Sequence, residues 1–317
     1  MLQRFVLEAG LVHRRHASLM CLLACGYAHT VIIGRAGQVL TCGRGVAGQL
    51  GHGNTEPVFE FKEVQEPLLA QKRVIAVAAG LAHSLALTEF GSVFSWGAGA
   101  YGQLGDGNTT MSTLPNNVSG LLSGRRVKAI ASGDAHCLCV THEGTVFTWG
   151  RGSCGQLGSG AQADALSPIE IGGLLRGRRV RQIACGGDHS LALLEEGRVM
   201  AWGSASHGQI GIGTVDSYHL LPVEVAGLSR HSGALAKGIA AGQLHSLALT
   251  DTGKVYAWGN GHSGQLGQGG FGQLSPAPVQ VKGHLEGVRV KLLSAGGDHS
   301  AAVIEKVRRR VKASMTK

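Results

Sequence analysis

The chain has 317 residues, of which 44% are hydrophobic and 15% are charged, and its formal net charge is +9. This composition excludes an intrinsically disordered protein, because disordered chains combine low hydrophobicity with high charge. It also argues against transmembrane helices, since no apolar run reaches the ~20 residues that a spanning helix needs. The 51 glycines are interleaved with Val, Ile and Leu, which predicts a strand-rich fold with many turns.

Residues 1–18 are predicted to form a separate N-terminal segment. Within it, residues 5–11 (FVLEAGL) resemble residues 222–228 (PVEVAGL). The likeness predicts a strand that pairs with residues 288–312 and closes a ring, and an open ring is the alternative. A mitochondrial presequence is a second alternative for this segment, because it carries three arginines and a single acid.

A repeat built around one histidine covers residues 19–304. The histidine recurs every 53 to 56 residues, with one glycine three residues before it and, in the first five copies, a second glycine eight residues after it. A tryptophan follows at the thirteenth residue in four copies, and G-Q-L-G or G-Q-I-G begins at the nineteenth in five. Such fixed offsets indicate a repeat architecture. The repeated residues are His29, His83, His136, His189, His245 and His299, with Trp96, Trp149, Trp202 and Trp258 and, in the first copy, Cys42.

Each complete copy predicts four short strands. In the second copy these are residues 74–79, 84–88, 92–96 and about 114–118. A tight turn through Gly91 joins the second and third strands, and the histidine is placed in the turn between the first and second. A proline opens the fourth strand, which predicts an outer edge, since proline cannot donate to a ladder. These prolines are Pro115, Pro168, Pro222 and Pro278.

The sequence therefore predicts an all-β fold, a β-propeller of four-stranded blades with five complete repeats and a partial sixth. In the sixth copy Val307 replaces the turn glycine. Residues 305–317 are predicted to be a basic C-terminal tail. The complete blades are expected near residues 19–72, 73–125, 126–178, 179–234 and 235–287.

Several motifs suggest chemistry, but each recurs in step with the repeat. Gly97, Gly99 and Gly102 spell G-x-G-x-x-G, yet related strings occur in five copies and no acid follows ~20 residues later, as a dinucleotide site requires. Asp188-His189-Ser190 resembles a catalytic triad, but neighbouring strand residues point to opposite faces. The histidines are expected around a ring, too far apart to share a metal. We predict no catalytic, cofactor or metal site.

The repeat positions are instead assigned structural roles. The tryptophans are predicted to fill the space between adjacent blades, and the histidines to occupy equivalent turns. The structural positions are His83, His136, His189, His245, Trp96, Trp149, Trp202 and Trp258.

The combination A-x-G-x-x-H-S-L-A-L, G-x-V-x-x-W-G and G-Q-L-G resembles the regulator of chromosome condensation repeat family, over about residues 19–304. The resemblance implies a propeller, usually of seven blades. It also implies one of several functions: a guanine nucleotide exchange factor for a Ran-type GTPase, a plant ultraviolet-B photoreceptor, or a scaffold within ubiquitin ligases and ciliary proteins.

Two departures from the family patterns bear on these functions. The Ran exchanger inserts a hairpin wedge from one blade, whereas the copies here differ in spacing by only three residues. The photoreceptor has tryptophan just before the repeat histidine, whereas Tyr27 is the only aromatic residue at these positions here. Both departures favour the scaffold.

Arginines at equal offsets before the histidines indicate where a partner binds. Four predicted blades carry one in the loop that precedes their first strand, an arrangement suited to an acidic partner. The alternative is that acids of the neighbouring tight turns pair with these arginines. The arginines are Arg73, Arg126, Arg179 and Arg289, and the acids are Glu89, Glu143, Glu195, Glu196 and Asp251.

The predicted function is a non-catalytic protein-interaction scaffold, and the alternative is an exchange factor for a Ran-type small GTPase. The expected partner is a protein, acidic in the scaffold case. Nucleic acid is disfavoured, because opposite charges alternate and aromatic residues do not interleave with the basic ones. The seven cysteines lack a framework spacing and favour a reducing compartment, so the expected location is cytoplasmic, with the nucleus as the alternative.

Overall fold

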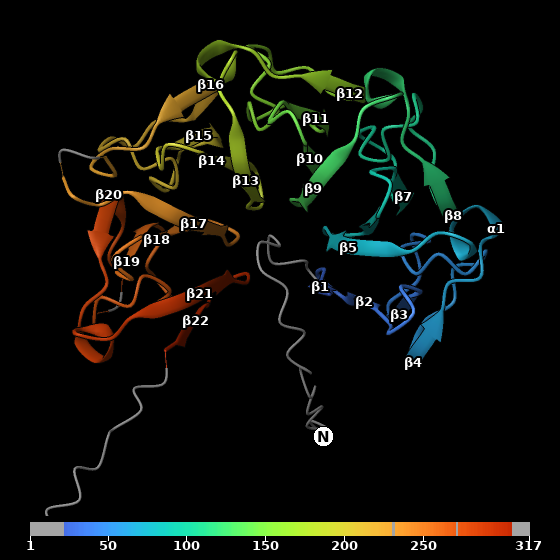
Figure 1. The fold of residues 1–317 in the computed structure, drawn as a ribbon, viewed down its shortest axis with the longest axis horizontal. Coiled ribbons are helices and arrows are strands. Elements are labelled where there is room, and N and C mark those ends of the chain that lie inside the picture. The colour runs from blue at the N-terminus through green and yellow to red at the C-terminus, as the bar shows by residue number, and fades with distance from the viewer. Residues whose placement is uncertain (1–21, 230–231, 271, 306–317) are drawn as a thin grey trace, which may run out of the picture.

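The computed structural model describes residues 22–229, 232–270 and 272–305. Over these residues the strands form six antiparallel sheets, five of four strands and one of two. Figure 1 shows the sheets set around a common centre, with the first strand of each nearest the centre and the fourth strand at the rim. This is a β-propeller, and it confirms the predicted class with five complete blades and a partial sixth.

The first three blades follow one another along the chain, each with its strands in sequence order across the sheet. Blade 1 contains β1 (Leu23–Cys25), β2 (His29–Ile33), β3 (Val39–Gly43) and β4 (Val58–Glu63). Blade 2 contains β5 (Val74–Ala79), β6 (His83–Thr88), β7 (Val93–Gly97) and β8 (Ser112–Asn117). Blade 3 contains β9 (Val127–Ser132), β10 (His136–Thr141), β11 (Val146–Gly150) and β12 (Ala165–Glu170).

The remaining strands form two complete blades and the partial one. Blade 4 contains β13 (Val180–Cys185), β14 (His189–Leu194), β15 (Val199–Ser204) and β16 (Tyr218–Glu224). Blade 5 contains β17 (Ala236–Ala241), β18 (His245–Thr250), β19 (Val255–Gly259) and β20 (Ser275–Gln280). Blade 6 contains β21 (Val290–Ala295) and β22 (Ser300–Ile304).

Single helical turns occur in four of the connections between blades, and the sequence pattern did not predict them. Each begins at a proline or at a glycine of positive φ and ends a few residues before the first strand of the next blade. These turns are α1 (Pro67–Ala70), η1 (Gly120–Leu122), η2 (Gly173–Leu175) and η3 (Gly283–Leu285).

Two expectations about strand boundaries are wrong. The prolines do not open the fourth strands: Pro168 lies within β12, and the pairing of β11 with β12 shifts register between Thr148 and Gly150. This shift leaves a place in the outer strand where a missing N–H is tolerated. The histidines are not turn residues either. His83 is the first residue of β6 and pairs with Gly97 of β7, because its ring is buried against the next blade.

The apolar core lies between the blades rather than within any one of them. The second and third strands are buried throughout their length in blades 2 and 3, and so is the second strand of blade 4. Between blades 1 and 2, Val31 and Val39 pack with Ala86, Phe94 and Trp96. Each blade therefore needs its neighbour in order to bury its two faces, as in other repeat architectures.

Two expectations fall on the ends of the chain. The predicted pairing of residues 5–11 with blade 6 lies outside the described residues, and so does most of the predicted tail at 305–317. Within the part of the chain that the structure describes, no helix is long and apolar enough to cross a membrane.

Candidate functional site

A hydrogen-bonded joint links each blade to the next, and the repeated histidine and tryptophan belong to it. Between blades 4 and 5, His189 Nε2 lies 2.9 Å from Ser246 Oγ, and this hydroxyl donates to the Gln209 carbonyl oxygen at 2.9 Å. Trp258 Nε1 donates to the same carbonyl oxygen at 2.9 Å. Gln209 belongs to the G-Q-I-G of blade 4, so the three repeat motifs meet at one buried carbonyl.

The same arrangement recurs around the ring with one variation. At the joint of blades 2 and 3 Cys137 replaces the serine, and its thiol lies 3.1 Å from His83 Nε2 and 3.4 Å from the Gln103 carbonyl oxygen. Ser132 Oγ also lies 2.8 Å from His83 Nε2. The other histidine–serine pairs are His29–Ser84, His136–Ser190 and His245–Ser300, at 2.9 to 3.0 Å.

The joint fixes the protonation of the histidines. Because the serine hydroxyl donates to the glutamine carbonyl, it must accept from Nε2–H, which leaves Nδ1 unprotonated. Burial lowers the pKa of the imidazoles to about 3 in three copies and about 4 in two, so all five are neutral near pH 7. The value is about 3 for His83, His136 and His189, and about 4 for His29 and His245.

Two repeated glycines are required where the backbone closely approaches a histidine ring or, in the first four copies, a tryptophan ring. A Cβ built on Gly133 would collide with Cε1 and Nδ1 of the His136 ring and with the Gly186 carbonyl oxygen. A Cβ on Gly105 would lie 2.9 Å from the indole of Trp149, and Gly105 has φ of +68°. The glycines of the supposed dinucleotide string are likewise required by close backbone packing, because a Cβ on Gly97, Gly99 or Gly102 would collide with backbone atoms of Ala82, Thr110 or Leu166.

The residues that resemble a triad do not form a proton relay. His189 pairs with Ser246 of the next blade, and Ser190 pairs with His136 of the preceding one. The Asp188 carboxylate accepts from Gln156 Nε2 at 2.9 Å, and burial raises its pKa. Among the described residues, no group of three or more His, Cys, Asp or Glu side chains has the geometry to hold a metal ion.

The four arginines singled out by the sequence lie on one face of the propeller, which we name the arginine face. Each is exposed and immediately precedes the innermost strand of its blade. The carbonyl oxygen of Arg73 accepts from Glu89 N at 2.9 Å, and Val74 N donates to the Gly37 oxygen of blade 1 at 2.9 Å. Equivalent bonds surround the other three. The arginine face comprises Arg73, Arg126, Arg179 and Arg289, while Leu235 takes this position in blade 5.

Within the described ranges, no carboxylate lies within 4.0 Å of any arginine of this face. The acids of the neighbouring turns make other contacts: Glu196 lies 3.6 Å from Arg178 and 3.7 Å from Arg198. Arg125 lies 3.9 Å from Glu170. Arg125 and Arg178, which immediately precede two arginines of the face, therefore pair with acids. The guanidinium groups of the arginine face itself stay exposed to solvent.

A second set of basic residues, missed in the sequence analysis, lies two positions after three of these arginines and after Leu235 in blade 5. Lys128 is half-buried and its Nζ donates to the Val180 carbonyl of the next innermost strand at 2.9 Å. Arg181 reaches the Ala236 carbonyl in the same way at 3.4 Å. The signal was the spacing R-V-K or R-V-R, whose first and third residues share a side of an extended chain. The set comprises Lys128, Arg181, Lys237 and Lys291.

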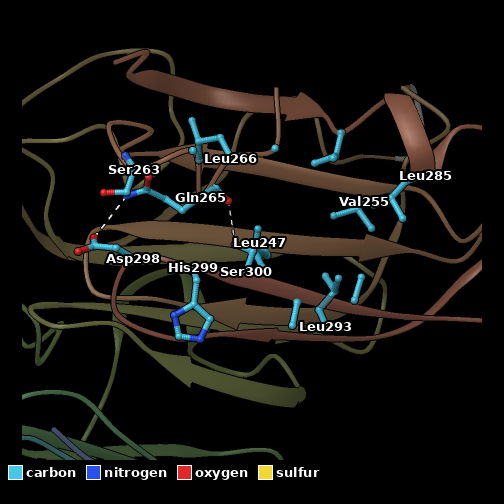
Figure 2. A pocket seen from close by; sticks show the side chains of 15 residues that line it. Leu247, Val255, Ser263, Gln265, Leu266, Leu285, Leu293, Asp298, His299 and Ser300 are labelled. Carbon is cyan, nitrogen blue, oxygen red and sulfur yellow. Dashed lines mark hydrogen bonds between the residues drawn. The ribbon is translucent and has the colours of Figure 1, made fainter. Parts of the chain in front are cut away.

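Two hollows lie between neighbouring blades, one between blades 1 and 2 and one between blades 5 and 6. One, of about 420 Å³, is beside Arg73 and is lined in part by Gln71, Lys72 and Glu89. The other, of about 320 Å³, lies between blade 5 and the two strands of blade 6. Figure 2 shows leucines on both sides of this second pocket, with Ser300 and His299 beside it.

A ring of four-stranded blades held by a repeated histidine, serine and tryptophan joint defines a repeat-type β-propeller. The chain belongs to the RCC1-like domain family, whose sequence profile matches residues 8–310. This finding confirms the resemblance inferred from the repeat motifs.

Several known proteins are similar to the chain. The human E3 ubiquitin-protein ligase HERC2 is 38% identical over 87% of this chain and 6% of HERC2. The Ultraviolet-B receptor UVR8 of Arabidopsis thaliana is 35% identical over 90% of this chain and 62% of the receptor. The solved structure of Prp20p from Saccharomyces cerevisiae, studied with its binding to Gsp1p and histones, has a TM-score of 0.78 at 26% identity, covering 90% of this chain and 69% of that one. The chain thus spans less than two thirds of both sequence relatives.

Proposed function

We propose that the chain is a non-catalytic protein-interaction module, and that its arginine face binds an acidic protein partner. The observation that carries the proposal is the exposure of four arginines at one repeated position, with no carboxylate in pairing distance among the described residues. An arginine presents five donors in a rigid fork that matches a carboxylate. Repetition of that group around a ring suits a partner with several acidic side chains.

The remaining motifs support a role in binding rather than catalysis. The histidines, tryptophans and glycine strings are each engaged in the joints between blades, so they leave no reactive group that needs a further explanation. Beside Arg73, the hollow of about 420 Å³ gives the arginine face a recess next to one of its charges. Lys72 and Arg73 line this hollow together with Glu63 and Glu89, so it offers both donors and acceptors to a partner.

Reversing two charges on the arginine face is expected to weaken partner binding at least about tenfold, because an acidic partner then meets repulsion. The variant is Arg126→Glu with Arg179→Glu in the intact chain. Partners are captured from a cell extract, compared by quantitative mass spectrometry, and the captured protein is then titrated after purification. Wild-type affinity should fall steeply with added salt, since exposed charges are screened over about 10 Å at 0.1 M.

A matched control reverses two arginines at the opposite end of the blades. Arg44 and Arg151 each follow a third strand, β3 and β11, and so lie on the other face. The variant Arg44→Glu with Arg151→Glu should keep the affinity of the wild type. Normal binding of every partner by Arg126→Glu with Arg179→Glu, in a folded protein, would mean that the arginine face is only architectural.

The alternative function is nucleotide exchange on a Ran-type small GTPase, and the similarity to Prp20p favours it. An exchange factor of this kind uses a wedge that projects from one blade. The connections between third and fourth strands in the described blades are residues 44–57, 98–111, 151–164, 205–217 and 260–274. Their near-equal lengths leave little room for a wedge, so we rank exchange second. A cytoplasmic location is part of the proposal, with the nucleus as the alternative.

A further inference from the structure

The pocket beside blade 6 corresponds to the space that an indole fills at four other joints. At each of those joints a third strand brings a tryptophan against the preceding blade, and its Nε1 donates to a glutamine carbonyl at 2.9 to 3.0 Å. In the pairing of β18 with β19, Trp258 lies directly opposite Ser246 and Gly259 lies opposite His245. The four tryptophans are fully buried: Trp96, Trp149, Trp202 and Trp258.

The joint between blades 5 and 6 has the hydrogen bonds of the histidine, the serine and the glutamine carbonyl, but among the described residues it has no tryptophan. His245 Nε2 lies 2.9 Å from Ser300 Oγ, and Ser300 Oγ donates to the Gln265 carbonyl oxygen at 2.8 Å. Among the described residues, no indole reaches that carbonyl. The pocket of about 320 Å³ opens beside it, as Figure 2 shows, with Ser300 and Gln265 joined by a hydrogen bond at its side.

The lining of the pocket matches the surroundings of Trp258 position by position. At the preceding joint, five aliphatic residues pack in one cluster with that tryptophan. Residues at the same repeat offsets line the pocket, so its walls have the shape and polarity that suit an indole. The cluster residues are Leu191, Val199, Ile210, Val225 and Ile239, and their counterparts in the pocket are Leu247, Val255, Leu266, Val281 and Leu293.

The chain's own sequence does not supply the matching residue. Thirteen residues after His299, where the second to fifth copies have tryptophan, the sequence has Lys312. Burying a lysine ammonium group in a largely apolar pocket is unfavourable unless the charge is paired. Asp298 is the one acidic residue that lines the pocket, and its carboxylate already accepts from Gln265 Nε2 at 3.4 Å. A second copy of the chain is equally unsuited, because its tryptophans are buried in its own joints. The polarity of the pocket therefore suits a tryptophan-bearing segment better than residues 305–317.

We propose that the edge of β22 and this pocket bind an extended segment of a separate protein. The segment runs antiparallel to β22, with a tryptophan opposite Ser300 and a glycine opposite His299. Within the described residues β22 pairs with β21 alone, and strand addition along its other edge would supply main-chain hydrogen bonds. Main-chain bonds to β22 provide affinity, and the tryptophan in the pocket provides specificity. This inference does not depend on the arginine face.

The experiment uses the intact chain and a probe taken from its own repeat. A fluorescein-labelled peptide Gly-Ser-Val-Phe-Ser-Trp-Gly, the sequence of residues 91–97, is titrated and followed by fluorescence anisotropy. Saturable binding is expected, and the same peptide with alanine in place of tryptophan should bind at least tenfold more weakly. The peptide should also raise the melting temperature of the chain.

Two variants on β22 separate the pocket from the strand edge. Ala302 lines the pocket, whereas Val303 does not and is 55% exposed. Ala302→Glu places a charge in the pocket and should reduce peptide affinity at least tenfold, while Val303→Glu should leave it within twofold of the wild type. Circular dichroism and the melting temperature verify that both variants are folded.

Three results would overturn the proposal. The first is no binding of the tryptophan peptide to the intact chain, and the second is equal affinity of the tryptophan and alanine peptides. The third is binding only after deletion of residues 1–12, because the chain's own N-terminal segment would then occupy the site. The charge reversal Arg126→Glu with Arg179→Glu should not alter peptide binding, so failure of the proposed function and failure of this inference are distinguishable.

Discussion

Replacing Trp149 by alanine is expected to lower the free energy of unfolding by about 3–5 kcal/mol, the usual cost of a large-to-small aromatic change in a core. Trp149 is fully buried and packs with Val118 and Leu122 across the joint of blades 2 and 3. Its Nε1 donates to the Gln103 carbonyl at 3.0 Å. The substitution opens a cavity and leaves that carbonyl with the weak Cys137 thiol as its donor, at 3.4 Å.

Two further variants separate packing from hydrogen bonding and from general effects. Trp149→Phe keeps most of the apolar volume but removes the N–H, so its loss should be smaller than that of the alanine variant. Phe90→Ala removes an aromatic ring that is 71% exposed in a tight turn, and it should change stability by less than about 1 kcal/mol. Denaturant unfolding measures all three. A Trp149→Ala midpoint equal to that of the wild type would contradict the assigned role in the joint.

Acidification from pH 7.5 to pH 5 is expected to remove most of the protein's stability. Five histidines are buried and neutral, with pKa values lowered by burial to about 3 or 4. In the unfolded chain the same groups have pKa values near 6.5. Between these values the unfolded state binds more protons than the folded state, so stability falls as the pH falls.

The size of the effect follows from the shift at each joint. At pH 5 each buried histidine favours unfolding by about 2 kcal/mol relative to neutral pH. Five of them amount to about 10 kcal/mol, comparable with the whole stability of an ordinary domain, about 5–15 kcal/mol. The raised pKa of Asp188 makes the folded state more stable as the pH falls, but this one carboxyl group is opposed by five histidines. The stabilisation is fully present above pH 6.5 and is lost progressively towards pH 3.

Denaturant unfolding at several pH values measures this dependence. His189→Gln removes one buried histidine. It should reduce the slope of the unfolding free energy against pH by up to about 1.4 kcal/mol per pH unit, the value for one bound proton. His142→Asn, a change at an exposed turn residue, is the control for the effect of a histidine substitution itself. Equal stability of the wild type at pH 5 and pH 7.5 would show that the buried imidazoles do not titrate as their burial requires.

The fold was predictable because the repeat offsets carry the strand pattern. The spacing from His83 to Gly91 and Trp96 placed a second strand, a tight turn and a third strand, and residues 74–79 were predicted with the boundaries that β5 has. The prediction that a proline opens each fourth strand was wrong, because a register shift inside an outer strand has no signature in a single sequence.

The contacts of the joint and the pocket could not be predicted from the sequence. Ser246 follows His245 in the chain, yet its hydroxyl hydrogen-bonds to His189 of the preceding blade. The sequence did show that the sixth copy lacks its tryptophan, but not that the walls around the missing indole form a pocket. Such facts depend on which elements from distant parts of the chain come together, and here the packing of each blade against the next decides them.

The rate of GDP release from a Ran-type small GTPase, measured with the intact chain at substoichiometric concentration, tests most directly whether the protein binds without catalysis. An exchange factor stabilises the nucleotide-free GTPase and would accelerate release many-fold at such concentrations. We expect the release rate to stay at its intrinsic value, because the connections between the third and fourth strands lack a projecting wedge in the described blades. A many-fold acceleration would contradict the interaction module and assign the chain to nucleotide exchange.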